Sequence, residues 1–213
     1  MSEIFREIDE ELRRENLLKL WSRYGKHAIA VVIAIMLMVG GFVAWRDHQA
    51  SERRAQSARY NSALAMAREG KNSEAGQVFA TVSRDGGGYG VLAAFEQADL
   101  LAKAGDAKGA VAAYDRIAVS PDLDPEFRDI ATLLSVMHSL PDGDAKAAIA
   151  KLEPLTASGS PWRATALELT AVAQLKSGDK ANARDIYQKL ADDLGAPQGL
   201  RARAAEMVTA LAD

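Results

Sequence analysis

A stretch of seventeen apolar residues with no charge, residues 28–44, constrains the fold of this chain more than any other feature. A helix from His27 to Trp45 rises about 1.5 Å per residue and is roughly 28 Å long, close to the hydrocarbon thickness of a bilayer. Aromatic and basic side chains, which favour the headgroup level, flank the stretch on both sides. They are Trp21, Tyr24 and Lys26 before it, and Trp45 and Arg46 after it. The sequence therefore predicts a transmembrane helix over residues 28–45.

A buried core helix and a cleaved signal peptide are the alternatives. A core helix normally carries polar residues on one face, which residues 28–44 do not. A signal peptide has a short basic leader, a shorter apolar stretch and a cleavage site of small residues. Here 27 residues precede the stretch and AWRDHQA follows it. We therefore expect a single uncleaved span.

Residues 1–27 form a predicted amphipathic tail, because their apolar residues recur at helical spacing. Six acids balance six bases in this tail, so attraction to lipid charge is not the obvious force on it. A helix on the membrane surface or on a partner therefore competes with a solvated extension. The fifteen residues before the span hold five bases and the fifteen after it hold four, which leaves the orientation open.

The rest of the chain repeats one spacing four times. A glycine is followed by alanine five positions later and by a bulky side chain nine positions later, and the glycines are 35, 38 and 35 residues apart. The four sets are Gly70, Ala75 and Phe79; Gly105, Ala110 and Tyr114; Gly143, Ala148 and Leu152; and Gly178, Ala183 and Tyr187. Positions in a repeat are counted below from this glycine, so that Ala75 is at +5.

Each copy predicts a hairpin of two helices. Glycine permits the left-handed turn that ends the first helix, and an Asp directly after it can accept hydrogen bonds from the first amides of the second helix. The small residue at +5 lets the two helices approach closely, and the residue at +9 fills the gap one turn further on. The Asp residues are Asp106, Asp144 and Asp179, and the matching close-contact residues at −7 are Ala63, Ala98, Val136 and Ala171.

The phasing predicts an all-α solenoid of four hairpins over residues 46–213. Asp124-Pro125 and Ser160-Pro161 each place a capping side chain before a proline suited to a first helical turn. A final helix closes the stack, because terminal repeats need a cap. The expected helices are 47–69 and 73–83, 89–104 and 107–118, 125–140 and 144–156, 161–176 and 180–193, and 197–212.

Charge and composition argue against several functions. The chain has 26 basic and 29 acidic residues, so no excess of positive charge is available to bind a nucleic-acid backbone. It has no cysteine, and its three histidines, His27, His48 and His138, form no metal-binding pair. We therefore expect no nucleic acid, no metal and no cofactor.

Motifs of catalysis are also missing from the sequence. The glycine-rich residues 85–90 have no preceding strand and no following Lys-Ser or Lys-Thr, as a phosphate loop would, and are expected to be a flexible connector. Ser160 lacks the glycine two residues later that a nucleophile elbow requires. The sequence therefore predicts that the protein is not an enzyme.

The remaining candidate functional residues lie on the surface of the predicted solenoid. The first helices of stacked hairpins line the concave face of a solenoid, and positions −13, −10, −6 and −3 share one side of them. We call this side the first-helix face. On it, Tyr60 and Phe95 are candidate apolar anchors, and Asp99 and Glu168 are candidate polar contacts to an extended peptide or a partner helix. The alternative is that both aromatic rings pack between repeats.

A period near 34 with a small residue at −7, alanine at +5 and an aromatic residue at +9 resembles the tetratricopeptide repeat (TPR). In the third copy Leu152 stands where the TPR has an aromatic residue. The whole chain has a leading tail that ends in LWSRYGK, one span that ends in GGFVAWR, and four helix pairs. In this arrangement it resembles the bacterial ancillary Sec translocon subunit family.

This resemblance implies a single-pass protein of the bacterial inner membrane, with its N-terminus in the cytoplasm and a TPR-like domain in the periplasm. It implies a protein-binding role, with Sec translocon subunits, a membrane-anchored prolyl isomerase and exported polypeptides as partners. A TPR scaffold that organises another envelope complex, for cell division, secretion or cell-wall assembly, is the alternative.

Overall fold

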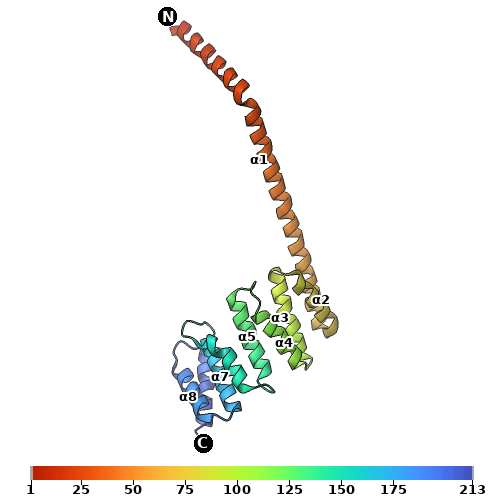
Figure 1. Ribbon diagram of the computed structural model, residues 1–213, viewed down its shortest axis with the longest axis vertical. Coiled ribbons are helices and arrows are strands. Elements are labelled where there is room, and N and C mark those ends of the chain that lie inside the picture. The colour runs from red at the N-terminus through yellow and green to blue at the C-terminus, as the bar shows by residue number, and fades with distance from the viewer. Residues whose placement is uncertain (1, 213) are drawn as a thin grey trace. The chain divides into compact units, whose positions relative to one another are not determined.

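The computed structural model describes residues 2–212, with side chains from Leu18 onward except those of residues 19, 20 and 28. Over this range the chain forms nine α-helices, one short 3-10 helix and no strand (Figure 1). The prediction of an all-α fold is confirmed. Two compact units are present, residues 1–56 and residues 57–213.

The first unit consists of most of one helix, α1 (Ser2–Arg68). The apolar stretch lies within α1, and its described side chains are exposed. Leu37 and Met38, for example, are 72% and 73% exposed. A helix can present such residues to lipid because its backbone amides and carbonyls bond to one another. By length and composition α1 contains a candidate membrane-spanning segment, none of which is buried inside the protein. The predicted amphipathic face of residues 1–17 lies outside the described side chains.

The compact repeat unit begins at Ser57, and not at residue 46 as expected. The α1 helix continues without a break through residues 46–56, and no side chain in this segment is fully buried. Charged residues dominate it, including Arg46, Arg53 and Arg54. A charged, exposed helical segment therefore connects the apolar stretch to the first residues that pack into a core.

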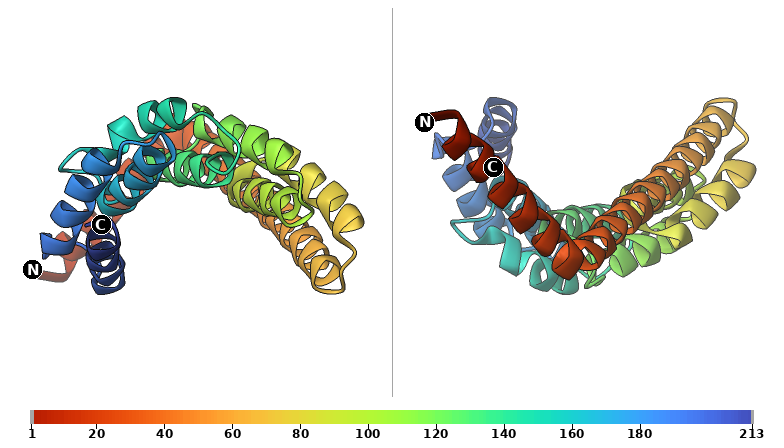
Figure 2. Two further views of the ribbon diagram at one scale, coloured as in Figure 1. Left: turned by 90° about the horizontal axis from the view of Figure 1, so that it is seen from below. Right: turned by 90° about the horizontal axis from the view of Figure 1, so that it is seen from above.

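The second unit is a row of helix hairpins that follow one another along a curve (Figure 2). Each hairpin contains a first and a second helix, and a last helix closes the row. The pairs are residues 57–68 of α1 with α2 (Asn72–Asp85), α3 (Gly87–Lys103) with α4 (Ala107–Ala118), α5 (Pro125–Ser139) with α6 (Ala145–Leu152), and α7 (Arg163–Lys176) with α8 (Lys180–Asp192), followed by α9 (Gln198–Ala210).

The caps that separate the helices are those the sequence predicts in most repeats. The carboxylate of Asp106 accepts a hydrogen bond from the Gly109 amide at 2.8 Å, and Asp144 and Asp179 accept equivalent bonds at the starts of α6 and α8. Gly70, Gly105 and Gly178 have φ angles of 79°, 83° and 86°, a left-handed conformation that favours glycine. Each short turn therefore reverses the chain with little strain.

The third repeat ends its first helix differently. Gly143 does not adopt positive φ, and two more residues separate it from the end of α5 than in the other copies. Here the Lys176 ammonium of α7 donates to the carbonyl oxygens of Leu140 and, at 2.9 Å, of Pro141. A side chain from the next repeat thus satisfies carbonyls that a helix end leaves free.

Four local predictions are wrong in detail. The Asp124 side chain, predicted to cap the helix that begins at Pro125, makes no cap hydrogen bond. The glycine-rich segment is not a flexible connector, because only Gly86 separates α2 from α3. Close packing explains this, since a side-chain carbon on Gly90 would stand 3.3 Å from the carbonyl oxygens of Val82 and Ser83. The helix expected from Pro161 begins at Arg163, and the Ser160 hydroxyl accepts a bond from the Trp162 amide within the preceding turn. The helix expected over residues 144–156 changes at Glu153 into a 3-10 helix, Glu153–Thr156, which contains a proline at its start.

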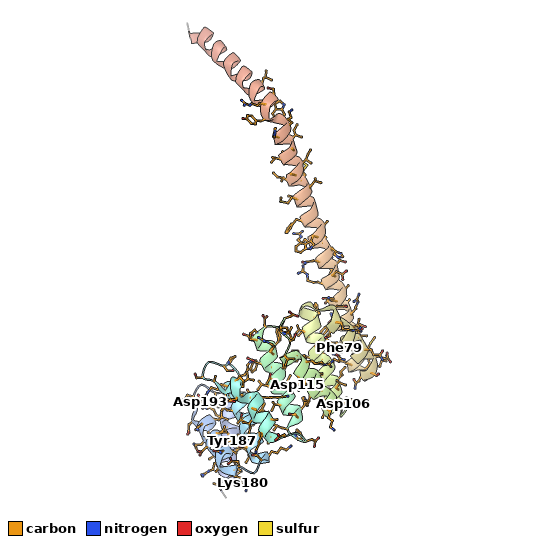
Figure 3. The ribbon with its side chains drawn as sticks, in the orientation of Figure 1. Phe79, Asp106, Asp115, Lys180, Tyr187 and Asp193 are labelled. Carbon is orange, nitrogen blue, oxygen red and sulfur yellow. The ribbon has the colours of Figure 1, made fainter. Side chains whose placement is uncertain are left out.

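The core follows the repeat spacing. The side chains at +5 and +9 are buried in all four copies, as are those at −7. Ala63 and Ala75 share one core cluster, and Ala98 and Ala110 share the next. The glycines at position 0 are exposed in the turns. Phe79 and Tyr187 mark the two ends of this series (Figure 3).

Candidate protein-binding surface

The aromatic residues at −10 lie at junctions between repeats. The Tyr60 ring lies 5.6 Å from the Phe79 ring of its own hairpin and 5.6 Å from the Tyr89 ring of the next. The Phe95 ring lies 6.1 Å from the ring of Tyr114 and 6.5 Å from that of Phe127, measured between ring centroids. Both side chains remain partly exposed. Each ring therefore fills a junction between two repeats.

Sequence reasoning missed the third member of each junction. Tyr89, Phe127 and Trp162 all stand at −16 in their repeats, and each packs against the +9 or −10 residue of the preceding repeat. In the third junction, Leu133, Leu152 and Trp162 belong to one core cluster. The signal was present as an aromatic residue 35 to 38 positions apart in three copies. It lay just outside the spacing used to define the repeat.

The two candidate polar contacts have partners within the protein. Asp99 forms an ion pair of 2.5 Å with Lys103 one turn along α3. Glu168 of α7 accepts two hydrogen bonds, at 2.9 and 3.0 Å, from the Arg203 guanidinium of α9. This fork of two parallel bonds ties the closing helix to the last hairpin and raises the pKa of Arg203. The Glu168 carboxylate is therefore already bound within the protein, by Arg203. The partner of Asp99, Lys103, is itself an exposed side chain.

Three apolar side chains stay exposed on the first-helix face. They are Leu92 of α3, Met137 of α5 and Val172 of α7, which are 44%, 47% and 39% exposed. Leu92 is at −13, and Met137 and Val172 are both at −6. Equivalent positions on successive repeats line up along a solenoid, as those of Met137 and Val172 do. Leu92 stands two helical turns before the equivalent position of α3, so the three residues mark an oblique apolar path over three hairpins. Such a path is suited to another polypeptide.

A groove of about 740 Å³ lies elsewhere, between the first two hairpins and the start of α5. Val91, Ile117 and Phe127 contribute its apolar lining, and no residue at the four face positions of α3 lines it. Its charged residues, Arg84, Arg116, Asp122 and Asp124, cancel. The groove thus offers space without a preference for ligands of either charge.

One polar cluster resembles a catalytic arrangement but has a structural role. The Ser135 hydroxyl donates to Asp115 at 2.5 Å, and the Lys151 ammonium lies 2.7 Å from the same carboxylate and 3.3 Å from the hydroxyl oxygen. Ser135 is fully buried, so no substrate reaches it. These bonds instead connect α4, α5 and α6 (Figure 3 labels Asp115). Among the side chains that the structure describes, no group of three or more His, Asp or Glu residues could hold a metal ion.

The phenols of Tyr60 and Tyr114 add neutral polar groups near the face. Burial, followed by the negative charges of Asp99 and Glu96, raises the pKa of Tyr114. Burial and the charge of Glu96, which accepts a hydrogen bond from the phenol, likewise raise the pKa of Tyr60. Both phenols therefore stay protonated and can donate hydrogen bonds at neutral pH.

Comparison with known proteins identifies the repeat type. The tetratricopeptide repeat-like domain family matches residues 19–209. The chain belongs to this family. The matched range includes the apolar stretch as well as every TPR-like hairpin and α9.

A curated relative narrows the comparison. The ancillary SecYEG translocon subunit of Escherichia coli (strain K12) is 26% identical over 170 residues, which cover 78% of this chain and 80% of that protein. The expected resemblance to the ancillary translocon subunit family is confirmed by these two findings. Together they point to a non-catalytic, protein-binding role.

Proposed function

We propose that this protein is a membrane-anchored protein-binding module that acts as an ancillary subunit of the Sec translocon on exported polypeptides. The observation that carries the proposal is the union of one candidate span with four TPR-like hairpins in a chain related to an ancillary translocon subunit. The protein has no catalytic activity in this proposal. It contributes by binding exported polypeptides and by holding them near the translocon.

The first-helix face holds the polypeptide in this proposal. Leu92, Met137 and Val172 offer apolar contacts on successive hairpins, and the partly exposed Tyr60 and Asp99 add an aromatic and a polar contact. Individual contacts of this kind are weak, but the span confines the protein to the membrane. Tethering raises the effective concentration of a binding site for chains that emerge nearby.

The repeat unit faces the periplasm and residues 1–27 face the cytoplasm in the proposed topology. A membrane-anchored prolyl isomerase of the envelope is then a further partner on the periplasmic side. Protease added to the outside of spheroplasts tests the topology, and we expect it to digest residues beyond 60. Protection of these residues in intact spheroplasts, with digestion after lysis, would place the repeat unit in the cytoplasm and overturn the proposal.

Purification in mild detergent tests the partners. The intact chain is compared with a variant that lacks residues 1–45, and the co-purifying proteins are identified by mass spectrometry. We expect translocon subunits with the intact chain and not with the shortened one. Their absence from both preparations would contradict the role at the translocon.

An aggregation assay separates a binder of unfolded chains from a scaffold for another envelope complex. The intact chain in micelles is added to a denatured protein on dilution from guanidinium, and light scattering is followed. A binder of exported polypeptides slows the aggregation in proportion to its concentration. A scaffold for division, secretion or cell-wall assembly leaves the scattering unchanged.

A further inference from the structure

One line of side chains runs along α3 on the first-helix side. Leu92, Glu96, Asp99 and Lys103 are spaced by four, three and four residues, so they lie above one another on the helix surface. Leu92 is 44% exposed, and the side chains of Asp99 and Lys103 are 38% and 66% exposed. This line therefore combines an apolar group with charged groups that a partner can reach.

The charges along this line do not balance. Asp99 is paired with Lys103, whereas Glu96 forms no ion pair with any described side chain and accepts a long hydrogen bond of 3.4 Å from the Tyr60 phenol. The line thus carries two carboxylates and one lysine. The lysine side chain is more exposed than those of Leu92 and Asp99, and an exposed ion pair of this kind is weak.

The neighbouring repeats carry no charge at the positions that Glu96 and Asp99 hold. In the first and third repeats, the residues at −13, −10, −9, −6 and −3 are all uncharged. They are Ser57, Tyr60, Asn61, Leu64 and Ala67, and Ile130, Leu133, Leu134, Met137 and Leu140. The bases next to these positions are Arg68 and Lys103, both at −2. At the five positions of the first three repeats, Glu96 and Asp99 are therefore the charged residues.

The aromatic rings near Glu96 suit the apolar stem of a basic side chain. The rings of Tyr60 and Tyr89 lie 5.6 Å apart, and the Tyr60 phenol contacts Glu96. Lysine and arginine place an apolar stem on such surfaces and keep the charged head at a carboxylate, and their cations are attracted to aromatic faces. An acidic or carboxylate-ended peptide would instead be repelled by both acids.

We propose that the α3 line of Leu92, Glu96 and Asp99, with the Tyr60 ring beside it, is a subsite for a lysine or arginine flanked by apolar residues in a bound polypeptide. This subsite rests on the proposed polypeptide-binding function and gives it a chemical preference. Segments that carry basic residues next to apolar ones bind first, and acidic segments are excluded.

Fluorescence anisotropy on the full-length chain in uncharged detergent micelles tests the subsite. The probes are three fluorescein-labelled peptides, Gly-Ser-Leu-X-Phe-X-Leu-Ser-Gly, in which both X residues are Lys, Gln or Glu. We expect the Lys peptide to bind about fivefold more tightly than the Gln peptide, which is the effect of one ion pair that is exposed or partly buried. The Glu peptide should bind more weakly than both.

Matched variants assign the preference to α3. The double variant Glu96→Gln, Asp99→Asn should reduce the difference between the Lys and Gln peptides to less than about twofold. The control is Asp185→Asn, Glu206→Gln, which makes the same charge change at exposed sites on α8 and α9 and should keep the preference. Circular dichroism melting curves of both variants check that the fold is retained.

Salt dependence gives a second readout that needs no variant. Affinity for the Lys peptide should fall as ionic strength rises, while affinity for the Gln peptide stays nearly constant. Equal binding of all three peptides would overturn the subsite and leave polypeptide binding standing. A preference for the Glu peptide would also overturn it, and no binding by any peptide would contradict both the subsite and the proposed function.

Discussion

Small residues at +5 set how closely the two helices of each hairpin approach. Ala110 is fully buried in the cluster that also contains Ala98, and Ala183 is fully buried in the fourth hairpin. Interiors of this kind are close-packed, so an added side chain has no space to enter. These residues were singled out from spacing alone, because no other side chain permits the close approach.

Enlarging one of these alanines should destabilise the repeat unit. Ala110→Leu is expected to lower the free energy of unfolding by about 1–3 kcal/mol through overpacking. Ala112→Leu, at an exposed position of the same helix, is the matched control and should be nearly silent. Urea denaturation measures both, and an equal loss for the two variants would show that the repeats are phased incorrectly.

The Asp193 carboxylate makes stability depend on pH in the acid range. The hydrogen bond from the Gly195 amide, followed by that from Arg163, lowers the pKa of Asp193 below its ordinary value. A carboxyl whose pKa is lower in the folded state stabilises above its unfolded pKa, about 4, and loses this contribution as the pH falls through the folded value. Asp193→Asn should therefore lower the melting temperature near neutral pH.

The difference in melting temperature between Asp193→Asn and the unsubstituted protein should vanish in acid. Once the pH has fallen below the lowered pKa of the folded protein, the native carboxyl is protonated and uncharged, like the amide. Asp185→Asn, which makes the same substitution at an exposed position of α8, is the matched control. A difference in melting temperature that stays constant from neutral pH to acid would refute this assignment.

The order and ends of the helices were largely predictable, but what joins one hairpin to the next was not. Glycine turns and Asp caps depend on adjacent residues. The left-handed glycine is present in the first, second and fourth repeats, and the Asp cap in the second, third and fourth. The cap of α5 by Lys176 joins residues 35 and 36 positions apart, and the aromatic junctions join repeats. Such contacts depend on how hairpins stack, which no local pattern specifies.

The Lys176 bonds give a testable link between α5 and α7. Lys176→Met keeps an apolar stem and removes the donors to Leu140 and Pro141, so it should cost about 1 kcal/mol of stability. The control Lys180→Met removes an exposed lysine from the first turn of α8, where a positive charge is not favoured, and should not lower stability. Guanidinium titrations of both variants decide, and an unchanged midpoint for Lys176→Met would refute the cap.

Two neighbouring side chains of α3 separate packing from binding. Phe95 contacts rings of two repeats, so we expect Phe95→Ala to cost about 2–3 kcal/mol, less than a fully buried phenylalanine would. Leu92→Ala should leave stability within about 0.5 kcal/mol and weaken peptide binding, because Leu92 is exposed. Thermal melts and peptide anisotropy measure the pair. A stable Phe95→Ala variant that has lost binding would reverse the two roles.

As a whole, the chain joins an apolar segment suited to lipid to a repeat unit that packs its own core. The apolar segment of α1 buries none of its described side chains in protein, whereas the repeat unit buries small and bulky residues at fixed spacing. Both features were evident in the sequence, since each is a pattern of residue types. Candidate binding residues were harder to predict. Tyr60 and Phe95 fill junctions, and the exposure of the apolar residues Leu92, Met137 and Val172 became evident only once burial was known.

Site-specific photo-crosslinking in growing cells tests the central claim, that the first-helix face binds other polypeptides. A benzophenone amino acid replaces Leu92 or Val172 on that face, and Gln77 or Lys189 at exposed positions of the second helices as controls. The account predicts adducts with polypeptides in transit and with translocon subunits from Leu92 and Val172 and few from Gln77 and Lys189. Adducts of equal yield from all four positions, or from the second helices alone, would contradict it.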